Sequence, residues 1–401
     1  MLPDLRTAKG TARMHVQSLN HRVPTECTFT HAFIETNPGF DGWGAAVAAD
    51  FDSDGRDEYV TGGKGGGFYY LYDYEPAAGS WRRHVLTHGI SPNVGAAALD
   101  LDADGKLELV CGEWGSRLLY LTPPARGLDN WSVVPVFAGL SDPHDVVAGD
   151  INGDGRAEVV VRNKHGALLV FEPPPNPLQR WTGREVHPMC VGDGTTLARV
   201  GNSEHTSIVA NCGWFENVRG NGSEWVRHPL IPPSLHRHPE SRIVVADIDG
   251  DGHNEVIISE SEIDRARVGI FHYRNSDTPW EYEEVVPADR DLCALHSLQV
   301  VDLDNDGEAE IFTAEMEAGK TDGVRARPRW WCLKRAGAEW HRKAILDMNL
   351  GAHTAIAGYY TDPDTIGIVG KVWRANTVNG NGGANHVDAL VAHSEAGRMH
   401  R

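Results

Sequence analysis

Five short segments of this 401-residue chain carry acidic side chains at a spacing that could bind metal ions. Each has an acid or, once, an asparagine at positions 1, 3 and 5, a glycine at position 6 and a glutamate at position 9. Oxygen ligands spaced in this way in a tight turn converge on one hard cation, and calcium accepts six to eight oxygens in irregular geometry. A solvated acidic turn is the alternative, but five copies favour structural Ca²⁺. The predicted ligands are Asp50, Asp52, Asp54, Glu58, Asp100, Asp102, Asp104, Glu108, Asp150, Asn152, Asp154, Glu158, Asp247, Asp249, Asp251, Glu255, Asp302, Asp304, Asp306 and Glu310.

These turns differ from EF-hand loops. Position 12 is never a glutamate, and the residues that follow are typical of a strand rather than a helix. We therefore expect the glutamate at position 9 to supply the later ligand. Clustered carboxylates repel one another unless a cation neutralises them, so chelation should lower the stability of the fold.

Three histidines share one position relative to these turns. His144 and His296 stand six residues before the first acid of a copy, and His353 stands at the corresponding place in a degenerate copy. Imidazoles act as acids or bases near neutral pH and also bind metal ions. The catalytic candidates are His144, His296, His353, Arg242, Glu315 and Lys371, and the candidate substrate contacts are Trp114, Arg162, Glu260 and Trp373. An ordinary polar rim is the alternative for the charged members of this set.

A histidine pair, His236 and His238, lies in a long segment between two predicted strands. In an extended segment the two side chains point to the same side. With His296 or Glu240 as a third ligand they could hold Zn²⁺ or another divalent cation at the active site. The alternative is a basic loop without metal.

Repeated strands must position these residues. The first acids of the five copies are 50, 50, 97 and 55 residues apart, so a copy without acids, at residues 195–212, fills the long gap. A further degenerate copy spans residues 353–370, and a tryptophan recurs between successive units. Four short strands repeated about every 50 residues are typical of a propeller blade. The sequence therefore predicts an all-β fold, a seven-bladed β-propeller with calcium-binding turns.

We expect a single propeller domain at residues 27–395, with an N-terminal extension at residues 1–26 and a tail at residues 396–401. The segment 27–34 resembles an outer strand and should pair with the last blade near residues 387–391, which would leave no exposed edge at the seam. Each inner strand runs from the histidine position to the acidic turn. The metal turns and the catalytic candidates should therefore lie on opposite faces of the ring.

Composition excludes several classes of function. The chain has 37 Lys and Arg against 56 Asp and Glu, a formal net charge of −19, which disfavours nucleic acid because that affinity comes largely from basic side chains. No apolar run is long enough for a membrane helix and no signal peptide is seen, so we expect a cytoplasmic protein without membrane partners. The six cysteines are widely spaced without a CxxC pair, which favours reduced, buried thiols over disulfides. The oligomeric state stays open.

The acidic copies resemble FG-GAP or VCBS-repeat propellers over roughly residues 27–395. A narrower similarity, to the propeller domain of the aldos-2-ulose dehydratases, is carried by HDVVAGDINGDGRAEVV, WFEN, HSLQVVDLDNDGEAEIFTAEM and HTAIAG, the last followed by IVGKVW. Those enzymes are lyases that act on keto-sugars such as 1,5-anhydrofructose. The resemblance implies a carbon–oxygen lyase that performs β-elimination on a keto-sugar or keto-glycoside. A looser resemblance to calcium-dependent propeller polysaccharide lyases implies uronate glycans as substrates instead.

Elimination next to a sugar ketone requires a base, a stabiliser for the enolate oxygen and an acid for the leaving group. The histidines would serve as base, acid or metal ligand, and Arg242, Lys371 or a divalent cation would stabilise the oxyanion. Glu315 would orient a partner or transfer a proton, while Trp114 and Trp373 would form platforms for the sugar ring. The main rival is a non-catalytic carbohydrate-binding propeller. Polar residues that differ from blade to blade favour a single site, and hence an enzyme.

Overall fold

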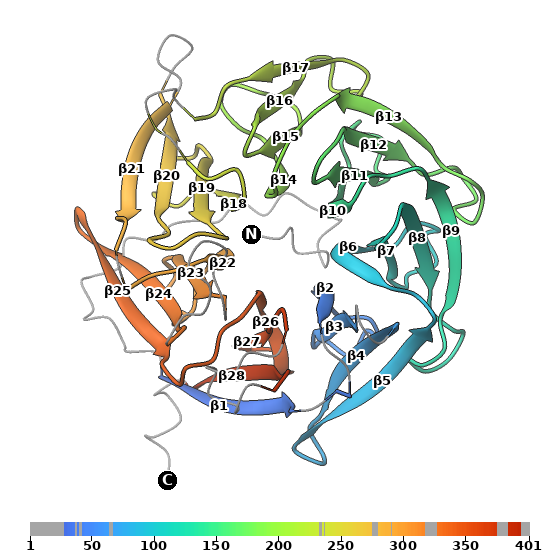
Figure 1. The fold of residues 1–401 in the computed structure, drawn as a ribbon, viewed down its shortest axis with the longest axis horizontal. Coiled ribbons are helices and arrows are strands. Elements are labelled where there is room, and N and C mark those ends of the chain that lie inside the picture. The colour runs from blue at the N-terminus through green and yellow to red at the C-terminus, as the bar shows by residue number, and fades with distance from the viewer. Residues whose placement is uncertain are drawn as a thin grey trace.

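The computed structural model describes residues 28–393 except 37, 40–41, 64–66, 232–234, 236, 275–279, 290, 317–326 and 375–383. Within these residues, 28 strands form seven four-stranded antiparallel sheets, arranged radially around a common axis (Figure 1). The predicted all-β, seven-bladed propeller is therefore confirmed. No helix in this part of the chain is long and apolar enough to cross a membrane. The predicted extension at 1–26 and tail at 396–401 lie outside the described residues.

Six blades each use four consecutive strands. Blade 1 consists of β2 (Trp43–Ala49), β3 (Glu58–Gly63), β4 (Phe68–Glu75) and β5 (Ser80–His88). Blade 2 consists of β6 (Pro92–Leu99), β7 (Glu108–Glu113), β8 (Arg117–Thr122) and β9 (Ser132–Ala138). Blade 3 consists of β10 (Pro143–Gly149), β11 (Glu158–Asn163), β12 (Leu168–Glu172) and β13 (Thr182–His187).

The second half of the ring repeats this order and includes both degenerate copies. Blade 4 consists of β14 (Thr195–Ala198), β15 (Ser207–Ala210), β16 (Gly213–Asn217) and β17 (Trp225–His228). Blade 5 consists of β18 (Ser241–Ala246), β19 (Glu255–Glu260), β20 (Val268–Tyr273) and β21 (Trp280–Val286). Blade 6 consists of β22 (Leu295–Val301), β23 (Glu310–Glu315), β24 (Trp330–Ala336) and β25 (Glu339–Leu346). Blade 7 consists of β26 (Thr354–Asp362), β27 (Thr365–Lys371), β28 (Val387–His393) and the N-terminal β1 (Thr28–Glu35).

The N-terminal strand closes the ring. β1 pairs antiparallel with β28, with residue 28 opposite residue 393 and residue 35 opposite residue 387, which confirms the predicted seam. Asp388 ties the two strands together, because its carboxylate lies 2.7 Å from Nε2 of His31 and 3.0 Å from Nε2 of His386. Closure in this way pairs the edge strands of the first and last segments of the chain.

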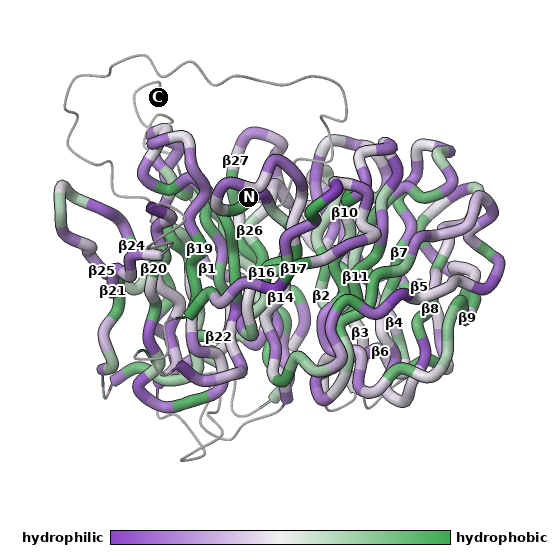
Figure 2. The backbone as a smooth tube through the Cα atoms, turned by 90° about the horizontal axis from the view of Figure 1, so that it is seen from above, coloured by the Kyte–Doolittle hydropathy of each residue, from purple (hydrophilic) through white to green (hydrophobic). Residues whose placement is uncertain are grey.

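The core is divided into clusters that lie between neighbouring blades. Seven such clusters are built from the facing apolar sides of adjacent sheets. The predicted outer-strand tryptophans belong to them: Trp131 and Trp181 are buried, and each donates its backbone N–H to the preceding blade. Seen edge-on, hydrophobic residues follow the strands and hydrophilic residues gather at the turns of both faces (Figure 2). Burial of apolar surface between blades, at about 25 cal/mol per Å², stabilises the ring.

Strand direction separates the two faces of the ring. In blade 3, His144 stands near the start of β10, and Asp150 follows its end. A strand rises about 3.3 Å per residue, so the two positions are roughly 20 Å apart. The turn at the far end needs glycine at position 6, where φ lies between 85° and 92° in all five copies, a region that side chains with a Cβ rarely adopt.

The expectation of reduced cysteines is wrong for one pair. Cys190 and Cys212 form a disulfide with their Cα atoms 5.8 Å apart. Among the described residues, Cys111, Cys293 and Cys332 lie outside this disulfide. The pair was missed because its 22-residue separation matches no motif. It forms because the β15–β16 hairpin returns to the loop that enters blade 4.

Candidate functional site

Side chains from several blades meet at the entry of the inner strands, on the face opposite the acidic turns. His144 of blade 3 and Arg242 of blade 5 both approach the carboxylate of Asp193, which lies in the loop before blade 4. Nε2 of His144 is 3.8 Å and Nη1 of Arg242 is 3.6 Å from Oδ2 of Asp193. Asp193 is fully buried, and its Oδ2 accepts no hydrogen bond from the described residues. We call these residues, together with His296, His353 and the side chains that contact these two histidines, the imidazole cluster.

His296 and His353 lie against each other in this cluster. Their ring centroids are 3.8 Å apart, and Nδ1 of His296 bonds to the backbone carbonyl of His353. Nδ1 of His296 therefore carries the ring proton. Its Nε2 lies 2.9 Å from Nη2 of Arg242 and accepts a hydrogen bond from it. His353 in turn stacks on Trp373 with centroids 4.7 Å apart, and its Nδ1 lies 2.9 Å from Nζ of Lys371.

Burial keeps both rings neutral. It lowers the pKa of His296 to about 4, with a further contribution from the positive charge of Arg242. It also lowers the pKa of His353 well below its ordinary value, and His296 and Lys371 lower that pKa further. Both imidazoles are therefore uncharged at neutral pH, the state in which a ring can accept a proton or bind a metal.

His144 is oriented by Asp145, a residue that the sequence analysis did not single out. Nδ1 of His144 lies 3.0 Å from Oδ1 of Asp145, whose other oxygen accepts from the backbone N–H of Gly194 and the hydroxyl of Thr195. Burial alone would raise the pKa of Asp145, but the hydrogen bond and charge of His144 and the charge of Arg162 hold it well below its usual range. Nδ1 of His144 thus carries the proton, and Nε2 is the basic nitrogen. The sequence did contain a clue to this role, since Asp145 directly follows His144.

Asp193, Glu262 and His296 form a buried set that could hold a divalent cation. One ligand atom from each lies within 4.8 Å of the others. Oδ2 of Asp193 is buried without a hydrogen-bond donor, and Nε2 of His296 lies 3.5 Å from Oε1 of Glu262. Buried carboxylates require compensating charge, and nitrogen and oxygen ligands of this kind suit zinc. A cation here would compete with Arg242 for the same lone pair of His296. Sequence analysis missed both carboxylates, although Asp193 precedes Gly194, the residue at the histidine position of blade 4.

Arg162 does not join the cluster as a substrate contact. Its side chain is fully buried. Its guanidinium donates hydrogen bonds to the backbone carbonyls of Cys190, Val191 and Gly194. The structure therefore gives Arg162 the role of holding the loop that carries Asp193.

Three further candidates contact their own blades or the connections beside them. Glu260 pairs with Arg267 at 2.7 Å. The carboxylate of Glu315 is 3.0 Å from the backbone nitrogen of Arg329, which donates to it. Trp114 is half-buried in blade 2, where its backbone N–H donates to the segment before β6. The two glutamates therefore anchor connections at the exits of their second strands, and their predicted chemical roles stay predictions.

The predicted histidine pair is only partly described. His236 lies outside the described residues. Nδ1 of His238 is 3.9 Å from Oε2 of Glu240, and Oε1 of Glu240 is 2.8 Å from Nζ of Lys164. His296, offered as a third zinc ligand, lies instead with Asp193 and the other members of the imidazole cluster.

The acidic turn of blade 1 has the properties of a cation site. The backbone N–H of Phe51 donates to Oε2 of Glu58, whose Oε1 is buried without a hydrogen-bond partner. The N–H of Gly55 donates to Asp50 at 3.0 Å, and the four predicted acids of this turn bring their oxygens together. Burial, then the charge of Asp52, raises the pKa of Glu58 to about 9. A hard cation would relieve both the repulsion and the unsatisfied oxygen, so these residues fit the predicted Ca²⁺.

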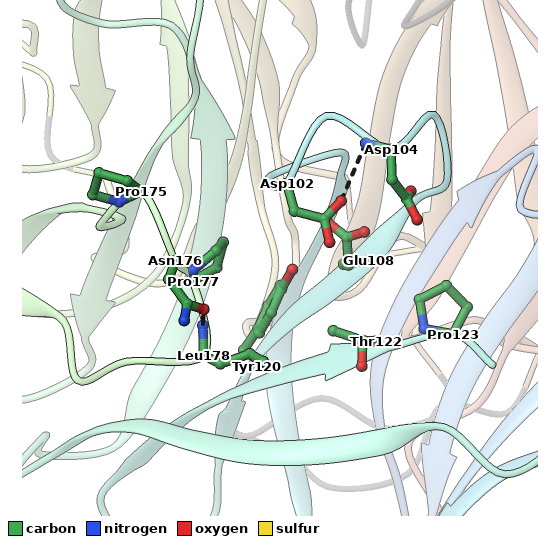
Figure 3. Close-up of a pocket in the computed structure, with 10 residues that line it drawn as sticks. All are labelled: Asp102, Asp104, Glu108, Tyr120, Thr122, Pro123, Pro175, Asn176, Pro177 and Leu178. Carbon is green, nitrogen blue, oxygen red and sulfur yellow. Dashed lines mark hydrogen bonds between the residues drawn. The ribbon is translucent and has the colours of Figure 1, made fainter. Parts of the chain in front are cut away.

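The turn of blade 2 opens into a pocket of about 370 Å³. Asp102, Glu108 and Tyr120 point into a common space there (Figure 3). Burial raises the pKa of Glu108 to about 7. This pocket is lined by the acidic turn and by residues 175–178, so it belongs to the metal face and not to the imidazole cluster.

The five turns are not equivalent. In blade 3, Nδ2 of Asn152 donates to Glu158 at 2.7 Å. In blade 5, Nδ1 of His272 lies 3.5 Å from Oδ2 of Asp249. In blade 6 the ammonium of Lys334 lies among the predicted ligands Asp302, Asp304, Asp306 and Glu310. It donates hydrogen bonds to Asp304 and Asp306 and forms an ion pair with Glu310. The five predicted metal turns therefore have different side chains beside their acids, and the turn of blade 6 already contains a positive charge.

Comparison with known proteins supports the repeat architecture. Residues 50–111, 100–161 and 247–313 match the FG-GAP-like repeat family. These segments contain the five acidic turns, so the chain contains FG-GAP-like repeats. No curated protein matches the chain, and the narrower similarity to aldos-2-ulose dehydratases therefore has no support from a relative.

Proposed function

We propose that this propeller is a carbon–oxygen lyase of the aldos-2-ulose dehydratase type, which eliminates water or an alcohol from a keto-sugar or keto-glycoside. One observation carries the proposal: a histidine–carboxylate pair, two cationic side chains and two stacked neutral imidazoles meet in one connected cluster. These are the groups that a β-elimination next to a ketone requires. The acidic turns on the opposite face contribute to stability only.

His144 is the proposed base. Its Nε2 takes the proton from the carbon next to the ketone, and the electron pair moves to the ketone oxygen to form an enolate. The carboxylate of Asp145 stabilises the imidazolium that results, because it accepts the hydrogen bond from Nδ1 at 3.0 Å. A positioned base of this kind contributes about 10²- to 10⁴-fold to the rate.

Arg242 is the proposed stabiliser of the enolate oxygen. Its guanidinium lies between Asp193 and His296, 3.6 Å and 2.9 Å away. Fixed positive charge aimed at a developing oxyanion is a large term in catalysis. A divalent cation held by Asp193, Glu262 and His296 would polarise the ketone oxygen in the same way.

Lys371 and His353 form the proposed acid. The ammonium of Lys371 donates to Nδ1 of His353, so the ring proton is on Nε2. As the bond from the β-carbon to its hydroxyl oxygen breaks, Nε2 gives its proton to that oxygen and Nδ1 receives one from Lys371. Water leaves, and the electrons of the enolate form the carbon–carbon double bond. The exposed part of Trp373, stacked on His353, offers an apolar face for the sugar ring.

A substrate panel tests the proposal. The protein is incubated with 1,5-anhydrofructose, 3-keto-glycosides and uronate oligosaccharides, with and without a chelator, and the ultraviolet absorbance of an unsaturated ketone is followed. Turnover of a keto-sugar supports the proposal. Cleavage of uronate chains alone, or binding of sugars without any new absorbance, would replace it with a polysaccharide lyase or a carbohydrate-binding propeller.

His84 provides a matched control for the base. It is a buried histidine on the outer strand of blade 1 and pairs with the half-exposed carboxylate of Asp129 at 2.8 Å. His144→Ala should lower kcat by about 10²- to 10⁴-fold, whereas His84→Ala removes the same kind of pair away from the cluster and should leave kcat unchanged. Equal effects of both substitutions would point to a general loss of structure.

A further inference from the structure

One position on the third strand distinguishes the acidic turns from one another. In blade 6 the last pair between the second and third strands is Ile311 with Leu333, and in blade 2 it is Leu109 with Leu121. The next residue of the third strand therefore faces the glutamate at position 9 of the turn, and we call it the facing residue. The facing residues of blades 1, 2, 3, 5 and 6 are Asp73, Thr122, Glu172, His272 and Lys334.

The facing residue of blade 6 places a positive charge inside the turn. Nζ of Lys334 lies 2.8 Å from Oδ2 of Asp304, 2.7 Å from Oδ2 of Asp306 and 2.9 Å from Oε1 of Glu310. Nζ donates hydrogen bonds to Asp304 and Asp306, and its charge also pairs with Glu310, whose Oε1 accepts no hydrogen bond from the described residues. The Glu310 side chain is 1% exposed and that of Lys334 is 20% exposed, so water screens these ion pairs only weakly.

The charge of Lys334 changes the acids around it. Its positive charge offsets the repulsion among Asp304, Asp306 and Glu310, because Nζ lies 2.7–2.9 Å from one carboxylate oxygen of each. In blade 6 a side chain thus supplies part of the positive charge that a metal ion would supply in blade 1.

We propose that Lys334 is a built-in cation that replaces the metal ion in the turn of blade 6, and that the facing residue decides whether a turn binds calcium. A calcium ion needs the same carboxylate oxygens at about 2.3–2.6 Å. It cannot share them with an ammonium group, because the two positive charges would occupy one space. In blade 2 the uncharged Thr122 lines the pocket with Asp102 and Glu108 and leaves those oxygens available to a metal ion (Figure 3).

An exchange of the two facing residues in the full-length chain tests the proposal. Bound Ca²⁺ per chain is counted by equilibrium dialysis and by titration calorimetry. Lys334→Thr should increase the count by one, and Thr122→Lys should decrease it by one. Lys334→Arg keeps the positive charge and should leave the count unchanged.

An unchanged calcium count in either exchange variant would overturn the proposal, as would a wild-type chain that binds no calcium. If Lys334→Thr folds only when calcium is present, the ion has taken the place of the ammonium group and the proposal is supported. If that variant does not fold under either condition, Thr122→Lys decides, because it adds a cation to a turn that has none. The calcium count is independent of catalysis, so the outcome does not depend on the proposed lyase activity.

Discussion

The ammonium nitrogen of Lys371 lies 2.9 Å from Nδ1 of His353. A protonated lysine only donates, so Nδ1 must accept and the imidazole proton is fixed on Nε2. Both side chains are buried, at 0% and 4% exposure, and the lysine charge is one of the causes that lower the pKa of His353. The charge of Lys371 therefore determines which nitrogen of His353 carries the proton.

Replacement of Lys371 by methionine should therefore affect His353 directly. Without the lysine charge the pKa of His353 rises, and the proposed acid loses its source of a proton. We expect Lys371→Met to lower kcat for the keto-sugar substrate by about 10²-fold or more and to shift the His353 signal in a titration followed by NMR. An unchanged kcat together with an unchanged titration would remove Lys371 from the mechanism.

Acid should destabilise the fold through His296. The pKa of this group is about 4 in the folded chain and about 6.5 in the unfolded chain, so between these pH values the unfolded chain binds more protons. The free energy of unfolding therefore rises with pH across that window. The contribution of His296 is complete above pH 6.5, and acidification through the window lowers the free energy of unfolding by on the order of 3 kcal/mol. Urea denaturation at a series of pH values measures the slope.

Two variants isolate this contribution. His296→Gln should flatten the slope between pH 4 and 6.5, because it removes the group whose pKa differs between the folded and unfolded chains. His88 is exposed, so His88→Gln should leave the slope as it is in the wild type. An equally steep slope in the His296 variant would assign the acid sensitivity to other groups.

The architecture was predictable because it repeats. Five copies of one turn, a recurring tryptophan and the spacing of 97 residues indicated seven blades, including the two without acids, and the seam followed from the strand-like segment at 27–34. The position of the histidines also came from the repeat, because equivalent positions in a ring face a common axis. These predictions depended on periodicity alone and needed no knowledge of individual contacts.

The partners of the histidines could not be predicted in this way. Asp193 and Glu262 lie in connections between strands, where the repeat places no equivalent residue in other blades. Arg162 was expected to bind substrate, but its guanidinium donates hydrogen bonds to backbone carbonyls of the loop before blade 4, and the path of that loop could not be predicted. Lys334 is separated from its turn by about one strand and a long connection, so only strand register reveals that it faces Glu310.

The disulfide should stabilise both the fold and the imidazole cluster. Cys190 begins the loop that carries Asp193, and it is cross-linked to Cys212 across a separation of 22 residues. Loss of a cross-link of this length costs about 3 kcal/mol in the chain-entropy model. We expect Cys212→Ser to lower the free energy of unfolding by about this amount and to reduce turnover, whereas Cys332→Ser should change neither by much.

Chelation should destabilise the ring through the turns that lack an internal cation. Binding to the folded chain alone adds about 2.7 kcal/mol per site when free calcium is 100 times the dissociation constant. A chelator should therefore lower Tm, and Glu58→Gln should reduce that difference, because it removes a charged ligand whose Oε1 has no other partner. Glu75 is a control in the same blade, since its side chain is exposed and forms an ion pair with Arg82 at the surface. If Glu75→Gln and Glu58→Gln change the chelator response equally, the response comes from net charge and not from a site in the turn of blade 1.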